Sequence, residues 1–291
     1  MIHTAHSSGA AQAIDTLVEA TALNRADPLR NGSLLEFPAY GQLVMTGDMH
    51  GHRRNFEKLC KYADLARASS RHVILHELIH QETLYNQPDT SYELLIEAAG
   101  YKCRFPDQVH FIQSNHELAQ LTGQRISKGG RDVVQEFSDS VVQGYGARDG
   151  EAILKSICAF IASFPLAART PNRVWLSHSL PNEREMSWFD PGIVHRTDFN
   201  DIDRHDGGSV YSLVWGRYHS PALLTRLGET WDVDIFITGH QPQETGYAIV
   251  HERLIIIASD HQHGVFLPFD LSKPQTVETL ERSIRKFVEV A

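Results

Sequence analysis

The chain has 291 residues, 42% of them hydrophobic, which is enough to bury a substantial core. Its 36 acidic and 27 basic side chains give a formal net charge of -9, which disfavours nucleic acid as a partner because the phosphate backbone would be repelled. No apolar run reaches the roughly 18 residues of a membrane span and the N-terminus lacks a secretory pattern, so we expect a cytoplasmic protein without a membrane partner.

The chain is predicted to form one α/β domain over residues 35–291, preceded by an appended N-terminal helix and connector over residues 1–34. Apolar residues at helical spacing between 11 and 23 indicate the helix, and Asn31-Gly32 indicates a turn. No internal repeat or long Pro/Gly/Ser linker divides the remainder.

Short β-rich runs then alternate with helical segments, as in an α/β sheet. The predicted strands are 42–46, 72–75, 109–112, 173–176 and 233–238. The predicted helices are 56–68, 92–99, 133–142, 153–164 and 222–227. After Gly246 the pattern changes to closely spaced strands at 247–250, 254–258 and 265–269, followed by a helix over 277–290. This change favours an antiparallel addition to the sheet.

Polar side chains follow five of these strands directly. They are Asp48 and His50, Glu77, Asn115, His178 and His240. If the strands are neighbours in one sheet, these groups meet at its carboxyl edge, where ligands bind in α/β proteins. Two carboxylates, one amide and three imidazoles suit a pair of divalent cations, with Glu77 as the bridging ligand. Such a pair can clamp a phosphoryl group and activate water.

Each motif alone is more often a turn or a helix cap than a ligand. Five in succession, each placed after a predicted strand, favour the joint functional interpretation. The 17 histidines supply the imidazoles, whereas Cys60, Cys103 and Cys158 are too widely spaced to indicate a disulfide framework or a thiolate site.

The motifs resemble those of calcineurin-like metallophosphoesterases. Residues 47–51 (GDMHG) resemble the GD-x-HG motif of that superfamily, residues 114–117 (SNHE) resemble GNHE, and residues 239–240 (GH) resemble its late GH. Residues 91–95, 105–107, 164–168, 175–181, 213–215 and 257–259 are similar to segments of the PPP-type serine/threonine phosphatases. The resemblance covers roughly residues 40–270.

The resemblance implies a four-layer α/β/β/α sandwich of two mixed sheets flanked by helices, with residues 35–291 as the catalytic domain. It implies hydrolysis of a phosphomonoester by hydroxide held at a dinuclear centre of Mn, Fe or Zn. Asp48, His50 and Glu77 would bind one metal, and Glu77, Asn115, His178 and His240 the other. His116 would protonate the leaving group, and Arg217 would hold the phosphate; Arg53 or Arg54 are weaker candidates.

The second family motif, GD-x-x-DRG, is altered here. Residues 76–82 read HELIHQE, so Glu77 replaces the bridging aspartate and Gln81 replaces a phosphate-binding arginine. His80 falls where the family has an aspartate that orients the catalytic histidine, and His80 or Glu82 can take that role. Ser114 and Ser179 replace glycines, which matters only if the backbone there has a positive φ.

Several functions stay open at this point. A phosphorylated serine or threonine of a protein is the leading substrate, and a dinucleoside polyphosphate or another small phosphoester is the alternative. Residues 76–80 also match H-E-x-x-H, a zinc peptidase motif that requires a helix. A third possibility is a binding module with an impaired site. The sequence leaves the oligomeric state open.

Overall fold

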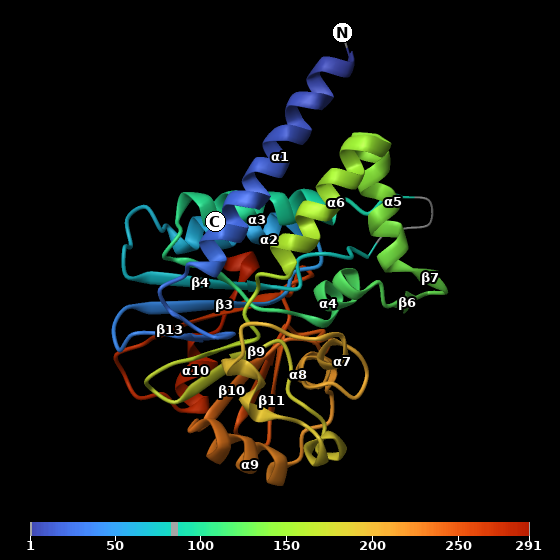
Figure 1. Cartoon of the computed structure of the whole chain (residues 1–291). Coiled ribbons are helices and arrows are strands. Elements are labelled where there is room, and N and C mark those ends of the chain that lie inside the picture. The colour runs from blue at the N-terminus through green and yellow to red at the C-terminus, as the bar shows by residue number, and fades with distance from the viewer. Residues whose placement is uncertain (1, 83–86, 291) are drawn as a thin grey trace.

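The computed structural model describes residues 2–82 and 87–290 and contains two mixed β-sheets packed face to face (Figure 1). The first sheet has the strand order β14 (Arg285–Lys286), β13 (Val265–Asp270), β3 (Gln42–Asp48), β4 (Arg71–His76), β5 (Val109–Phe111). The second has the order β1 (Arg30–Asn31), β2 (Leu34–Glu36), β8 (Ala167–Arg169), β9 (Val174–Ser177), β10 (Ile235–Thr238), β12 (Leu254–Ile257), β11 (Tyr247–Val250).

Helices cover the outer face of each sheet. The first sheet is covered by α1 (Ile2–Arg25), α2 (Arg53–Ala63), α3 (Ser91–Arg104), α5 (Val133–Tyr145) and α6 (Ala147–Ile161). The second is covered by α8 (Ser209–Trp215), α9 (Pro221–Trp231) and the short helices 183–187, 191–195 and α7 (Asp201–Arg204). The order helix, sheet, sheet, helix confirms the predicted four-layer architecture (Figure 1).

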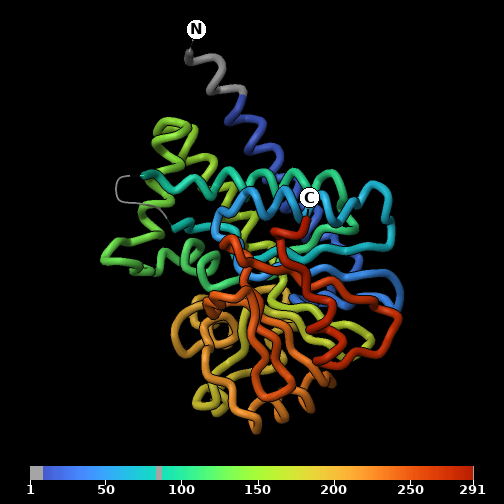
Figure 2. The backbone as a smooth tube through the Cα atoms, turned by 180° about the vertical axis from the view of Figure 1, so that it is seen from behind, coloured from blue at the N-terminus to red at the C-terminus, as the bar shows by residue number. Residues whose placement is uncertain are grey.

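Side chains that alternate between the two faces of each strand produce this layering. In β3, Leu43 and Met45 face the second sheet, whereas Val44 between them faces the helices. Successive side chains of a strand point to opposite faces, so an unbroken apolar run belongs to a strand buried on both sides. Figure 2 shows the late strand β13 beside the early strand β3, with which it pairs antiparallel.

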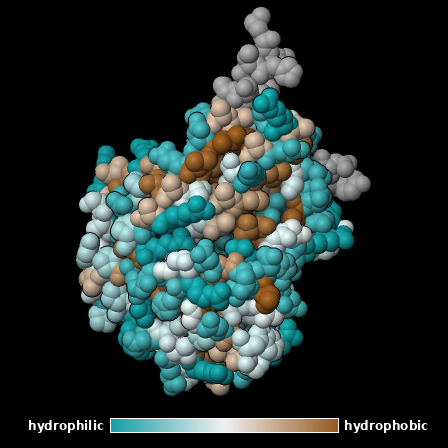
Figure 3. Space-filling view, viewed as in Figure 1, coloured by the Kyte–Doolittle hydropathy of each residue, from teal (hydrophilic) through white to brown (hydrophobic). Residues whose placement is uncertain are grey.

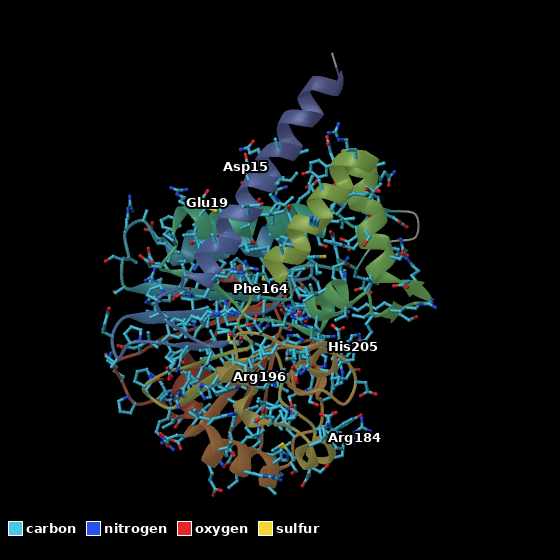
Figure 4. The ribbon with its side chains drawn as sticks, in the orientation of Figure 1. Asp15, Glu19, Phe164, Arg184, Arg196 and His205 are labelled. Carbon is cyan, nitrogen blue, oxygen red and sulfur yellow. The ribbon has the colours of Figure 1, made fainter. Side chains whose placement is uncertain are left out.

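The N-terminal helix α1 packs against α3 and α6. Its buried face includes Leu17, while Val18 is 58% exposed. Hydrophobic residues gather on the upper part of the molecule in the view of Figure 3. Asp15 and Glu19 project from α1, and Phe164 lies where α6 meets the sheets, stacked on Phe111 with ring centroids 4.8 Å apart (Figure 4). The division of the chain at residue 35 stays a prediction.

One predicted element was wrong and several were missed. The last helix, α10, is Val277–Ser283, not 277–290, because Ile284 turns extended and β14 pairs with β13. Phe287 is thereby buried in the helix-side core. The missed elements are β1, β2, β8, α7, α8, α4 (Asn115–Thr122) and the hairpin of β6 (Ser127–Lys128) and β7 (Arg131–Asp132). Among the described residues, no helix has the length and apolar character needed to cross a membrane.

Candidate metal centre

The predicted ligands come from the carboxyl ends of strands in both sheets. Asp48 ends β3, Glu77 follows β4, and Asn115 follows β5, all in the first sheet. His178 follows β9 and His240 follows β10, both in the second sheet. The five strands are thus divided between the two sheets, and their side chains meet although the strands do not share one sheet. The site lies at the seam between the sheets, where Ser259 N–H donates to Asp48 O over 3.1 Å.

Three of the predicted ligands form a close cluster. The Asn115 Oδ1 atom lies 2.6 Å from His178 Nε2 and 3.1 Å from His240 Nδ1, and the two imidazole nitrogens are 3.1 Å apart. The other ring nitrogen of His240 lies 3.3 Å from the carbonyl of Trp215. Since a carbonyl can only accept, Nε2 of His240 carries the proton and the Nδ1 lone pair faces Asn115.

The two carboxylates lie beside this cluster. Glu77 Oε2 is 3.6 Å from His178 Nε2 and 3.9 Å from His50 Nε2. The His50 Nδ1–H donates to the carbonyl of Ile79 over 2.9 Å, which leaves its Nε2 lone pair facing Glu77. Asp48 Oδ1 accepts from the His240 N–H over 2.9 Å. Glu77 therefore stands between His50 on one side and His178 on the other.

The electrostatics of the pair favour a bound cation. Burial and the adjacent negative charge of Asp48 raise the pKa of Glu77 well above its usual range. Burial would raise the pKa of Asp48 as well, but contact with His76 and the neighbouring imidazoles holds it well below the usual range. Two buried carboxylates this close repel each other when both are ionised, and a divalent cation removes that penalty.

The donor set fits the predicted metal ions. Among the described residues, Glu77 Oε1 and His178 Nδ1 are buried without a hydrogen-bond partner. Burial lowers the pKa of His178 well below its usual range and that of His240 to about 3, so both imidazoles are neutral and able to ligate. Nitrogen and oxygen donors of this kind accept Mn, Fe and Zn.

The predicted acid, His116, is held by a chain of hydrogen bonds. The Gln120 amide donates to Ser138 Oγ, and its Oε1 accepts from His80 Nε2 over 3.0 Å. His80 Nδ1 lies 2.9 Å from His116 Nδ1. Because burial lowers the pKa of His80 to about 3, His80 is neutral and its Nδ1 accepts from His116. The His116 Nε2 atom is thereby directed to the site, 3.8 Å from Glu77 Oε1.

Other predicted residues lie at different distances from the centre. Glu82 is exposed and makes no described contact with His116, so of the two candidates only His80 is placed to orient it. Arg217 is exposed. The pKa of His240 is lowered mainly by burial of the imidazole and secondly by the positive charge of Arg217. Arg53 pairs with Glu97 at 3.0 Å on α3, which favours a surface role.

Sequence reasoning missed His76 as a site residue. Its side chain is fully buried, its Nε2 lies 3.2 Å from Asp48 Oδ1, and with Asp48 and His178 it could hold a metal ion. A β-carbon at Gly239 would lie 2.7 Å from the same nitrogen and closer still to Asp48 Oδ1, so a side chain there would displace the Asp48 carboxylate and the His76 ring. The available signal was a histidine directly after the predicted strand 72–75.

The zinc-peptidase alternative was wrong. His76 ends strand β4 and no helix follows it among residues 77–82. His76 contacts Asp48, whereas His80 contacts His116, so the two imidazoles of H-E-x-x-H do not share a ligand position.

Backbone strain gathers at the same loops. His50, Glu77, His80 and His240 have φ angles of 40°, 48°, 61° and 67°, in the left-handed region that non-glycine residues rarely adopt. The serines that replace glycines are unstrained, since Ser114 has φ -113° and Ser179 has no positive φ. Ser114 instead caps α4 by accepting from Glu117 N–H over 3.3 Å.

The chain is similar in sequence to a known phosphatase over part of its length. The serine/threonine-protein phosphatase 4 catalytic subunit of Kluyveromyces lactis is 24% identical over 179 residues, which are 60% of this chain. The matched part is 48% of that relative, so the chain spans about half of its length.

Two solved phosphatases share the fold at low identity. A serine/threonine phosphatase from Saccharomyces cerevisiae, with similarity to human phosphatase PP5, has a TM-score of 0.65 at 15% identity, covering 89% of this chain and 82% of its own. A cold-active protein-tyrosine phosphatase of a psychrophilic Shewanella has a TM-score of 0.58 at 15% identity, covering 82% and 78%.

The match to a known family extends over most of the site. Residues 42–244 match the calcineurin-like phosphoesterase family, and this range begins at β3 and includes every predicted ligand from Asp48 to His240. The match spans more than half of the chain and confirms the resemblance that the motifs indicated. The chain belongs to the calcineurin-like phosphoesterase family.

Proposed function

We propose that this protein is a metal-dependent phosphatase that hydrolyses phosphomonoesters, with phosphoserine or phosphothreonine in a protein as the leading substrate. The observation that carries the proposal is the meeting of Asp48, Glu77, Asn115, His178 and His240 at one seam, with His50 and His116 directed toward Glu77. These side chains come from five loops of two sheets, and a purely structural role explains neither their burial nor their strain.

The donors divide into two overlapping sets. Asp48, His50 and Glu77 would hold one cation, and Glu77, Asn115, His178 and His240 would hold the other, with Glu77 shared. Two cations held in this way lower the pKa of a coordinated water and neutralise charge on the phosphoryl group. The glutamate has one methylene more than the aspartate of the family motif, and its left-handed backbone, with φ 48°, sets where its carboxylate lies.

The remaining residues act on the substrate. His116 presents Nε2 to the site while His80 accepts its Nδ1 proton and fixes its orientation. A bound phosphate dianion would favour the imidazolium form of His116, which carries a second proton on Nε2 and would give that proton to the departing alkoxide. Arg217 borders a cavity of about 760 Å³ together with Trp215 and Tyr218, beside His240. The guanidinium would bind phosphoryl oxygens, and the 82% exposed Tyr218 would contact a peptide that carries the phosphate.

A substrate panel tests this proposal. The protein is depleted of metal, reloaded with Mn²⁺, and given one peptide sequence phosphorylated on serine, threonine or tyrosine, together with a dinucleoside tetraphosphate. We expect two metal equivalents and highest turnover on phosphoserine or phosphothreonine. Preference for phosphotyrosine or for the dinucleotide would overturn the substrate assignment, and absence of bound metal would support the impaired binding module.

Two variants test the residue roles. His116→Ala should abolish turnover while both metal equivalents remain, because His116 is not among the proposed ligands. Asp48→Asn should abolish turnover together with loss of metal affinity. Unchanged activity in either variant would remove the role assigned to that residue.

A further inference from the structure

The altered second motif supplies no arginine from position 81 beside His50. Gln81 occupies the position at which the resembling family has a phosphate-binding arginine, and its Oε1 accepts from Thr90 Oγ1 over 3.2 Å. A neutral amide supplies a hydrogen bond but no charge to a phosphoryl group. Arg217 lies on the other side, next to His240, so the His50 side requires another source of positive charge if both flanks of a phosphate are held.

Lys128 lies at the tip of a hairpin built to hold it in place. Lys128 pairs with Arg131 across the two-residue turn of Gly129 and Gly130, whose φ angles are 59° and 79°. Such a turn requires left-handed backbone at both positions, which glycine adopts without strain. Arg131, opposite Lys128, joins the hairpin to α5 through a partly buried ion pair with Glu136, whose atoms lie 2.6 Å apart.

The lysine and a predicted metal ligand border the same cavity. A cavity of about 440 Å³ is lined by His50, Gln81 and Lys128, with the acidic residues Glu82 and Asp260 at its walls. Neither acid lies within 4.0 Å of the Lys128 ammonium, which forms no ion pair with any described residue. An unpaired ammonium in a cavity shared with His50 is suited to an anion that also contacts the metal centre.

The charge of Lys128 reaches the centre. Lys128 borders the same cavity as His50, whose ring lies edge-on to the ring of His116 with centroids 4.8 Å apart. Both histidines face Glu77, at 3.9 and 3.8 Å. The ammonium therefore lies within electrostatic range of the place where a phosphoryl group would sit.

We propose that Lys128, carried on the β6–β7 hairpin, binds the phosphoryl oxygens of the substrate from the His50 side and replaces the arginine absent at position 81. The proposal rests on the proposed phosphatase function. An ammonium on a flexible stem gives a point charge in place of a two-pronged guanidinium, so it holds phosphate by charge more than by geometry. Binding should then weaken strongly with added salt.

Phosphate binding to the metal-loaded protein tests the assignment apart from turnover. Inorganic phosphate is titrated into the Mn²⁺-loaded wild type, Lys128→Gln and Lys128→Arg, and the same proteins hydrolyse a phosphopeptide and p-nitrophenyl phosphate. We expect Lys128→Gln to weaken phosphate binding and to lower kcat/KM about tenfold, the usual effect of losing one charged hydrogen bond, with both metal equivalents kept. Lys128→Arg should retain most of both, and Lys155→Gln, which removes an exposed lysine on α6, should match wild type.

The Gln81→Arg substitution provides the sharper comparison. If Lys128 and an arginine at position 81 bind the same phosphoryl oxygens, Gln81→Arg should restore phosphate affinity in the Lys128→Gln variant. In the wild type the same substitution should increase phosphate affinity much less. An active wild type whose phosphate affinity, salt dependence and kcat/KM are all unchanged by Lys128→Gln would overturn this inference and leave the proposed function intact. A metal-loaded wild type inactive on every phosphoester would instead overturn the proposed function.

Discussion

At the scale of single residues, the proton positions on the histidines follow from their second hydrogen bonds. His50 gives its Nδ1 proton to the carbonyl of Ile79, and His240 gives its Nε2 proton to the carbonyl of Trp215. Each ring therefore turns a lone pair toward Glu77 or Asn115. The carbonyls of Ile79 and Trp215 thus select the ligand atom without approaching the centre themselves.

His76 should matter for metal affinity although the family motif has glycine there. Replacing His76 with alanine removes the nitrogen 3.2 Å from Asp48 Oδ1 and leaves a buried void beside that carboxylate. We expect Mn²⁺ affinity to fall about 10- to 100-fold, as is usual when a partner of a ligand is lost. Calorimetric titration measures the affinity, and circular dichroism checks that the variant is folded. Equal affinities would show that Asp48 is positioned without His76.

His80 should act through the orientation of His116. His80→Ala removes the acceptor of the His116 Nδ1–H, so we expect kcat to fall at least about tenfold with little change in KM. His80→Asn provides a shorter acceptor that tolerates the φ of 61° and should retain part of the rate. A rise in KM at constant kcat would contradict a positioning role.

The candidate ligands could be selected from the sequence because each follows an apolar β-rich run, and the structure brings them together. The roles proposed for His76 and Lys128 could not be predicted, because they depend on contacts between separate loops. His80 and His116, for example, are 36 positions apart and meet only after β4 and β5 have paired.

At the scale of elements, α1 is integrated into the helical layer through one face. Leu17 is fully buried against α3 and α6, while its neighbour Val18 is 58% exposed. Leu17→Ala should lower the free energy of unfolding by about 2 to 5 kcal/mol, and Val18→Ala should change it by less than about 0.5 kcal/mol. Urea unfolding of both variants measures the difference. Equal, small effects would show that α1 contributes little to the fold.

Helices and strands with regularly spaced apolar residues could be predicted from the sequence. Elements that form only because they pair with another strand could not. Strands β3, β4 and β11 lie within two residues of their predicted bounds. The two-residue strands β6, β7 and β14 have no pattern of their own, since they exist only through their partner strands. The same explains why the last helix was predicted too long: its end is set by the pairing of β14 with β13.

At the scale of the whole molecule, buried neutral histidines make stability depend on pH. Burial, with the neighbouring His110, lowers the pKa of His72 to about 4, whereas an unfolded histidine titrates near pH 6.5. Between these two pH values the His72 side chain is protonated in the unfolded chain and neutral in the folded protein. Its effect on the free energy of unfolding is therefore absent above about pH 6.5, and it destabilises the fold increasingly as the pH falls toward 4.

The His72→Gln variant isolates this contribution. Between pH 6.5 and 4, the free energy of unfolding of the metal-free wild type should decrease as the pH falls. In the variant this decrease should be smaller by about 1.4 kcal/mol per pH unit. Urea unfolding at several pH values measures both slopes, which should coincide above pH 7. Parallel curves throughout the acid range would show that His72 does not titrate with unfolding.

The fold class could be predicted because five alternating strands and helices admit few arrangements, and the motif resemblance selected one. The assignment of the five ligand-bearing strands to two sheets could not be predicted from those strands alone. It depends on Ala258 and Ser259, which follow β12 and join the end of β3 at Asp48.

The seam between the sheets also has a consequence for biosynthesis. The donors extend from Asp48 to His240, and His240 follows β10, which lies between β9 and the later strand β12. A nascent chain still lacking residue 240 carries Asp48, His50 and Glu77 without the complete set of partners. Loading of the complete proposed metal centre would therefore await the last fifth of translation, and a ribosome-bound fragment should be unable to hydrolyse phosphoesters.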